Sequence, residues 1–137
     1  MIAQLKFISV LVKHFNYSHT ALAIMAILTI SCESNQAEIA AKTKALEAQQ
    51  ELKMVHNLEY AHFLQFSAYS SDLEELNYPP HKLVTQGGTA LYEISIVEAS
   101  PTGFKAKAQA VQDFDGDGKF SIWEIDEEGR IKEVQTD

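Results

Sequence analysis

One run of twelve residues, from Asp113 to Glu124, constrains this chain more than any other part of its sequence. The run places carboxylates at its positions 1, 3, 5 and 12 and a glycine, Gly118, at position 6. Calcium takes about six to eight oxygen ligands, and a tightly wound loop can direct alternate side chains inward where a glycine permits the sharp turn. The sequence therefore predicts a Ca²⁺ site. Its predicted ligands are the carboxylates of Asp113, Asp115 and Asp117, the backbone carbonyl of Lys119, a direct or water-bridged oxygen of Ser121, and both carboxylate oxygens of Glu124.

The residues on either side of this loop do not follow a helical pattern. The spacing of the loop matches an EF-hand, whose loop lies between two helices, but apolar and polar residues alternate with a period of two from Phe104 to Ala110. After the loop, Phe120 to Ile125 is rich in residues that favour strands, and a turn ending at Gly129 leads to a third strand, Arg130 to Val134. We therefore expect a calcium loop, residues 113–124, that joins two antiparallel strands. The alternative is an acidic turn that binds no ion.

The residues before the loop predict a helix followed by a strand. Asn35 with Glu38 resembles a capping box, and residues 36 to about 66 are rich in helix-forming residues. Large apolar residues are sparse before Met54, which predicts a solvated stalk over residues 32–53 and a head over residues 54–137. The predicted fold class is α+β: a long N-terminal helix packed on a small antiparallel sheet of about four strands, one of them Ala90 to Val97. The apolar stripe expected on the helix comprises Ile39, Leu46, Met54, Leu58 and Ala61, and His56 and His62 are interpreted as ordinary helix histidines.

The first 31 residues have the features of an export signal. Basic residues precede an apolar run from Ala21 to Ile30, which is too short to cross a membrane. Cys32 is the single cysteine, and the segment Leu28 to Cys32 resembles the lipobox of bacterial lipoproteins. This resemblance implies that residues 1–31 are removed and that Cys32 carries a diacylglyceryl anchor, which is enough for stable membrane attachment. It places the protein in a bacterial cell envelope, facing the periplasm or the cell surface. The alternative is an incidental cysteine in an uncleaved signal anchor.

Three segments resemble type IV pilins and the pseudopilins of type II secretion. They are Phe66 to Leu76, Gly103 to Ala108, and Trp123 to Asp126 closing on Gly129, within a similarity that covers roughly Ala37 to Val134. The resemblance implies a helix whose second half packs under an antiparallel sheet, and a structural role for bound calcium. The chain lacks the pilin pattern of a glycine before the cleavage site followed by a long hydrophobic segment. We therefore expect a pilin-like head on a lipid-anchored stalk.

Charge and motif content narrow the functional classes. The chain has 19 acidic and 11 basic residues and a net charge of −8, which disfavours nucleic acid as a partner. No zinc-protease motif, nucleophile elbow or phosphate-binding glycine loop is found, so we expect no enzyme. The favoured function is a calcium-binding, membrane-anchored domain with a structural or interaction role and an envelope or filament protein as partner. The alternatives are an EF-hand-type calcium sensor and a minor pilin or pseudopilin subunit.

Overall fold

A computed structural model describes residues 36, 38–79 and 81–137 of the chain. The predicted signal peptide of residues 1–31 and the predicted lipidation site at Cys32 lie outside the described residues. The chain divides into two compact units with the boundary between Lys42 and Thr43. The described residues of the first unit are helical, and Lys42 forms an ion pair of 2.7 Å with Glu38. The second unit holds the sheet and the loop.

The helix covers residues 36 and 38–66, and its buried face is not the one that the sequence predicts. Four side chains, Ala48, Leu52, Val55 and Glu59, are completely buried. Their spacing of four, three and four residues matches the helical period. Of the predicted stripe, Ile39, Leu46 and Met54 are 57%, 53% and 38% exposed and Ala61 is exposed. The stripe is therefore wrong at these four positions, whereas Leu58 is half-buried; the packed face carries Leu52 and Val55, but its other two positions are an alanine and a glutamate.

Helix packing also begins earlier than the predicted boundary between stalk and head at residue 54. Ala48 and Leu52 have no exposed surface and share one core with residues of the sheet. Glu47 accepts the backbone N–H of Leu91 at 2.7 Å, across 44 residues of sequence. The prediction of a solvated stalk over residues 32–53 is therefore wrong for the part from about residue 47 onward.

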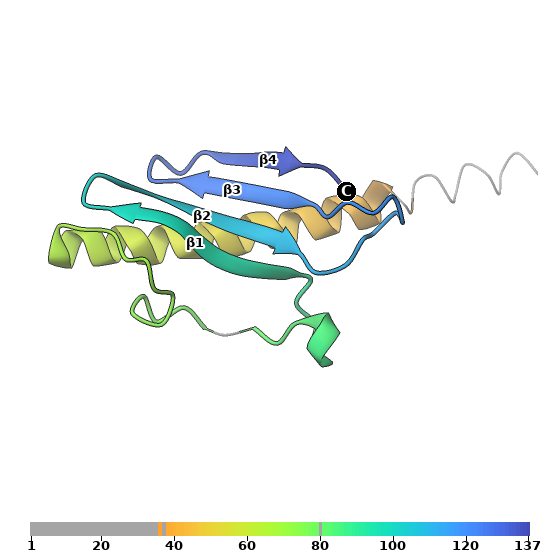
Figure 1. The fold of residues 1–137 in the computed structure, drawn as a ribbon, viewed down its shortest axis with the longest axis horizontal. Helices are drawn as coiled ribbons and strands as arrows, with labels where there is room; N and C mark the ends of the chain where they lie inside the picture. The colour runs from red at the N-terminus through yellow and green to blue at the C-terminus, as the bar shows by residue number, and fades with distance from the viewer. Residues whose placement is uncertain (1–35, 37, 80) are drawn as a thin grey trace, which may run out of the picture. The chain divides into compact units, whose positions relative to one another are not determined.

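The sheet has four antiparallel strands in the order β1-β2-β3-β4, so each strand pairs with its neighbours in sequence (Figure 1). β1 covers Tyr92–Ser100, β2 Gly103–Ala110, β3 Ile122–Asp126 and β4 Ile131–Gln135. A short 3-10 helix, η1, covers Val84–Gln86 before β1. The prediction of an α+β fold with a helix on a four-stranded antiparallel sheet is confirmed.

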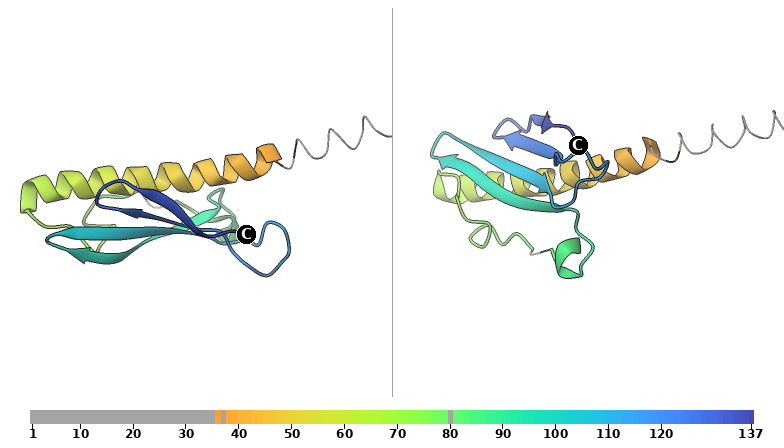
Figure 2. Two further views of the ribbon diagram at one scale, coloured as in Figure 1. Left: turned by 90° about the horizontal axis from the view of Figure 1, so that it is seen from above. Right: turned by 45° about the vertical axis from the view of Figure 1, so that its right-hand side comes forward.

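The two faces of the sheet differ as the alternation in β2 predicts. Phe104, Ala106, Ala108 and Ala110 are buried and form a core with Ile125 and the helix. The residues between them lie on the opposite face, where Lys105 is in register with Asp126 and Lys107 with Glu124. Figure 2 shows residues 43–66 of the helix along one face of the sheet, with no other helix or strand of the described residues over the opposite face.

The segment between the helix and β1 begins at Ser67, whose φ of 55° ends the helix. The sequence predicts one helical turn from Asp72 to Leu76. In the structure, residues 73–77 form a hydrogen-bonded turn in which Leu76 donates its N–H to the carbonyl of Asp72 at 3.2 Å, over the span of a helical bond, and the Asp72 carboxylate accepts the N–H of Glu74 at 2.8 Å. An aspartate that accepts this N–H caps the first turn of a helix, and the left-handed φ of 54° at Asn77 ends the turn after a single repeat.

A buried carboxylate joins this segment to the helix. Glu59 has no exposed surface, and its Oε2 accepts the N–H of Ser70 at 2.9 Å. Its Oε1 has no hydrogen-bond partner among the described residues. Burial raises the pKa of Glu59 above the usual 4.5, and the N–H of Ser70 and nearby His62 only partly oppose this effect.

We expect the substitution Glu59→Gln to change how stability depends on pH. A raised pKa in the folded state means that the stabilisation by the protonated group is fully present below about pH 4.5 and is lost as pH rises through the folded-state pKa. The glutamine variant keeps an oxygen for Ser70 without that loss, so its stability relative to the wild type should increase with pH. Urea unfolding at a series of pH values measures this difference. The exposed Glu74→Gln is the control, and a difference that does not vary with pH would contradict the expectation.

Candidate metal centre

The acidic loop forms the hairpin connection between β2 and β3. β2 and β3 are antiparallel, with Gln109 opposite Ile122, and Ala110 donates its N–H to the carbonyl of Ser121 at 2.9 Å. The loop therefore lies between strands on both sides, which confirms the arrangement expected from the period of two. In Figure 2 it projects beyond the end of the sheet.

Three of the predicted ligands meet in this loop. The carboxylates of Asp113, Asp115 and Asp117 each offer an oxygen, and these oxygens lie within 4.8 Å of one another. Asp113 is half-buried, and Asp115 and Asp117 are exposed. Within the described part of the chain, this is the one group of three or more such side chains that could hold a metal ion. Clustered carboxylate oxygens suit a hard divalent cation.

Backbone N–H groups fix the first carboxylate. Asp113 accepts the N–H of Gly116 at 2.6 Å with Oδ1 and that of Gly118 at 2.8 Å with Oδ2. Both glycines have left-handed φ angles, 85° and 86°, which residues with a Cβ rarely adopt. The N–H of Gly118 and then that of Gly116 lower the pKa of Asp113, so its charge persists to lower pH than that of an ordinary aspartate.

The third carboxylate is already paired with a lysine. The ammonium of Lys119 contacts Asp117 Oδ2, and the backbone N–H of Lys119 donates to Oδ1 at 2.8 Å. These contacts, led by that of the Lys119 side chain, lower the pKa of Asp117. A cation that enters between the three carboxylates must therefore compete with the Lys119 ammonium for Asp117.

Two of the remaining predicted ligands, Glu124 and Ser121, have other neighbours. Glu124 is in the middle of β3, opposite Lys107 on one side and Lys132 on the other, and is not part of the aspartate group. The side chain of Ser121 is only 4% exposed, and its hydroxyl accepts the indole N–H of Trp123 at 3.0 Å. The structure thus brings together Asp113, Asp115 and Asp117, with Lys119 beside Asp117, and leaves Glu124 outside the group, while the Ser121 hydroxyl is bonded to Trp123.

Residues that the sequence analysis did not identify attach the loop to the rest of the unit. Asp137 Oδ2 accepts the N–H of Phe114 at 2.7 Å. The ring of Phe114 packs against the core, with its centre 6.1 Å from that of the Tyr92 ring and 3.9 Å from Lys44 Nζ. A large apolar residue in an otherwise polar loop is a usable signal for Phe114. No local pattern marks Asp137 or Lys44, because their contacts depend on the tertiary fold.

The two helix histidines contact backbone carbonyls. His56 Nε2 lies 3.2 Å from the carbonyl oxygen of Glu127, and His62 Nδ1 lies 2.9 Å from that of Ala68. Both contacts link the helix to later parts of the chain, which is the role of structural histidines.

The described residues thus define a small α+β domain with an aspartate cluster that could hold a metal ion. In comparisons with known protein families and with characterised proteins, the chain matches none. Across the described residues, no helix combines the length and the apolar composition needed to cross a membrane.

Proposed function

We propose that this protein binds Ca²⁺ at Asp113, Asp115 and Asp117 and uses the ion to stabilise a small structural or interaction domain. The observation that carries the proposal is the convergence of the three carboxylates within 4.8 Å. Their mutual repulsion is relieved when a divalent cation replaces the single ammonium of Lys119. The carbonyl of Lys119 and water complete the coordination of the ion.

A structural role is supported by the attachment of the loop to the core. Phe114, the second residue of the loop, packs against the hydrophobic core, and its N–H is held by Asp137 from the end of the chain. The neighbouring carboxylate of Asp113 orders the two glycine turns through its hydrogen bonds. An ion that rigidifies this loop therefore also restrains Phe114, the loop residue that packs against the core.

A calcium titration tests this role. We expect saturable binding in the micromolar to millimolar range and a higher melting temperature, because a ligand that binds only the folded state stabilises it, by about 2.7 kcal/mol at a hundredfold excess over Kd. Calorimetry and thermal unfolding of the purified protein measure both, with Asp115→Ala/Asp117→Ala as the variant that should lose them. Circular dichroism should show no gain of helix. A gain of helix would support the calcium-sensor alternative, and the absence of binding heat would overturn the proposal.

We further propose that Cys32 anchors this domain to a bacterial envelope membrane through a diacylglyceryl group. The support is the lipobox-like segment before the single cysteine. Metabolic labelling with a palmitate analogue tests the anchor: we expect label on the wild-type protein and none on Cys32→Ser. Equal labelling and equal localisation of the two forms would contradict the anchor and leave the calcium proposal untouched.

A further inference from the structure

The strand β1 forms one edge of the sheet, and its outer edge carries backbone groups that no neighbouring strand uses. On the β2 side, Ala110 donates its N–H to the carbonyl of Ser121, in the direction of β3. The next residue, Val111, donates its N–H to the carbonyl of Leu91, in the direction of β1. Because bonding direction alternates along a strand, the β1 residues opposite Ala110, Ala108 and Ala106 point their N–H and C=O groups away from β2. These residues are Tyr92, Ile94 and Ile96.

The segment between the helix and β1 runs along this edge, is bonded to β1 near its start and folds back on itself near its end. Tyr69 donates its N–H to the carbonyl of Ser100 at 3.4 Å, near the end of β1. Before the start of β1, Leu83 forms a parallel bridge with Ala90. Among the described residues, no backbone hydrogen bond joins this segment to Tyr92, Ile94 or Ile96.

The middle of the segment is held to the helix rather than to β1. Tyr78 donates its hydroxyl hydrogen to Glu51 Oε2 at 2.6 Å, and His81 Nδ1 lies 3.2 Å from Glu51 Oε1. Burial, followed by the contact with Glu51, raises the pKa of Tyr78, so the phenol remains a donor at any physiological pH. The segment is therefore fixed at a distance from the edge that it follows.

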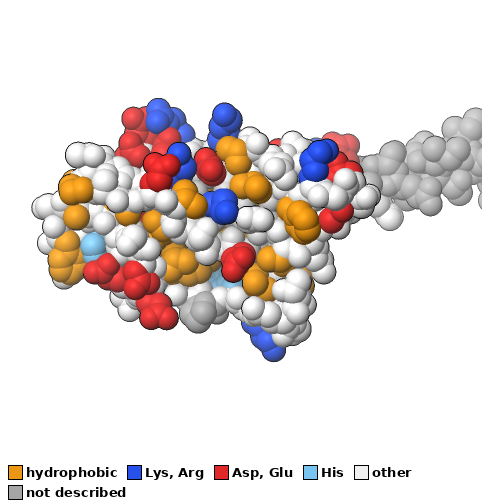
Figure 3. All heavy atoms as spheres, viewed as in Figure 1, with side chains coloured by type: hydrophobic (Ala, Val, Ile, Leu, Met, Phe, Trp, Pro, Cys, Tyr) orange, Lys and Arg blue, Asp and Glu red, His pale blue; other side chains and the backbone are white. Residues whose placement is uncertain are grey.

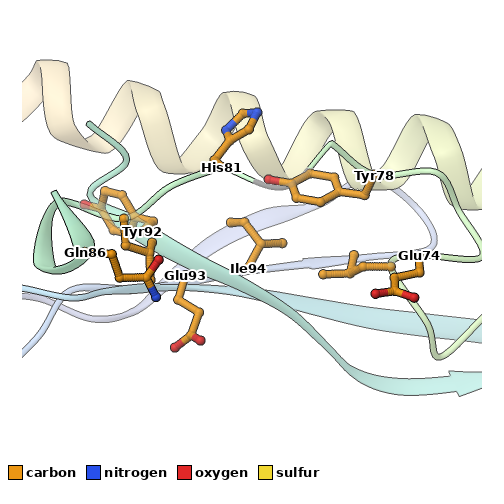
Figure 4. A pocket seen from close by; sticks show the side chains of 9 residues that line it. Glu74, Tyr78, His81, Gln86, Tyr92, Glu93 and Ile94 are labelled. Atoms are coloured by element: carbon orange, nitrogen blue, oxygen red, sulfur yellow. The ribbon is translucent and has the colours of Figure 1, made fainter. Parts of the chain in front are cut away.

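A cavity of about 330 Å³ lies between the segment and β1 (Figure 4). We call this cavity with the adjacent edge of β1 the β1 slot. In Figure 4 the side chain of Ile94 points from β1 toward Tyr78, and Glu93 points to the other side of the strand. The inner wall is thus apolar and aromatic, whereas the outer side is acidic. The lining residues are Leu73, Glu74, Tyr78, His81, Leu83, Gln86, Tyr92, Glu93 and Ile94.

The charges around the β1 slot favour a cationic occupant. Glu74 and Glu93 line it and are exposed, and Asp72 and Glu75 are exposed in the same segment. Figure 3 shows acidic side chains gathered over the segment that follows the helix. In a strand that pairs with β1, every second side chain lies on the outer face of the sheet, beside Glu93. A lysine or arginine at such a position forms a cross-strand pair with Glu93.

We propose that the β1 slot binds an extended segment of a partner protein in which apolar residues alternate with lysine or arginine. The segment adds to the sheet as a fifth strand, pairing with the outward groups of Tyr92, Ile94 and Ile96. Its apolar side chains enter the cavity beside Ile94 and Tyr78, and its cationic side chains lie beside Glu93. Unpaired main-chain groups supply affinity in this mode of recognition, and the alternate side chains supply specificity. This inference goes beyond calcium binding and uses no residue of the loop.

Amide hydrogen exchange tests the pairing directly. The probe is the capped peptide Val-Lys-Val-Lys-Val, added to the full-length ¹⁵N-labelled protein in the presence of EDTA and, separately, of Ca²⁺. We expect slower exchange at the amides of Tyr92, Ile94 and Ile96, and no further change at Glu93 and Ser95, which already bond to β2. The same peptide with N-methyl groups on its pairing edge should give no protection. Failure of the calcium site would not alter this pattern, so the two proposals fail separately.

Charge variants test the identity of the partner. We expect Glu74→Gln/Glu93→Gln to weaken peptide binding by about fivefold, in keeping with two exposed ion pairs. Glu128→Gln/Glu133→Gln makes the same charge change at exposed sites in the β3–β4 turn and in β4 and should have no effect. Equal binding of Val-Glu-Val-Glu-Val, or protection at β4 in place of β1, would overturn the proposal. Protection at β1 that grows with protein concentration in the absence of peptide would assign the edge to a second copy of this chain and would overturn it as well.

Discussion

Replacing Asp113 by asparagine is expected to lower calcium affinity by about a hundredfold, because affinity in such loops depends on the number of charged ligands. Asparagine keeps an oxygen for only one of the N–H groups of Gly116 and Gly118, which Asp113 accepts with different oxygens, so the variant removes the charge together with one hydrogen bond of the turn. The three carboxylates lie within 4.8 Å of one another, so each contributes to the field at their centre. Isothermal calorimetry at constant ionic strength measures the loss.

The substitution Glu124→Gln is the matched comparison for Asp113→Asn. Both remove one negative charge from the same twelve-residue run, but Glu124 lies in β3 between Lys107 and Lys132. We therefore expect its calcium affinity to change by less than about threefold, which is the effect of a distant charge. A loss as large as that of Asp113→Asn would show that Glu124 coordinates the ion, as the spacing of the sequence predicts, and would contradict its separation from the aspartate group.

The substitution Leu52→Ala is expected to destabilise the domain by about 2 to 5 kcal/mol, the usual range for removing a fully buried leucine side chain. Leu52 has no exposed surface and is one of the largest completely buried side chains among the described residues. Its surroundings include the small side chains of β2, which cannot move to fill the cavity. Urea unfolding followed by circular dichroism gives the free energy of unfolding.

Leu46→Ala provides the control on the same helix. Leu46 is 53% exposed, so the same change there should cost less than about 0.5 kcal/mol. The sequence pattern places Leu46 on the packed stripe and residues 32–53 in a solvated stalk, and it therefore predicts little cost at Leu52. Equal costs at the two positions would contradict the helix orientation in this structure.

The elements in which apolar or acidic residues recur at a regular spacing were predictable from the sequence. The alternation from Phe104 to Ala110 predicts the buried face of β2, and the carboxylates at alternate positions of the loop predict the cluster of Asp113, Asp115 and Asp117. Both depend on neighbours a few residues apart in the chain. Local spacing determines such features almost completely.

The rest of the site depends on the secondary structure after the loop. In an EF-hand the last ligand lies on a helix, where each residue advances about 1.5 Å, whereas an extended strand advances about 3.3 Å. Because Ile122 to Asp126 is a strand, Glu124 is carried away from the carboxylates along β3. The buried helix face escaped prediction for another reason: only Leu52 and Val55 mark it as apolar, whereas its other two positions are Ala48 and Glu59, whose burial depends on tertiary neighbours.

The row of alanines on β2 also limits how this domain can diverge. Ala106, Ala108 and Ala110 are at most 2% exposed and share one core with Leu52 and Val55 of the helix. The methyl groups of these three alanines thus set the distance between the helix and the sheet. A larger side chain at any of the three positions has no space. In related sequences, an increase in size at one of these alanines should therefore be accompanied by a decrease at the helix position that faces it, so that the two sites change together.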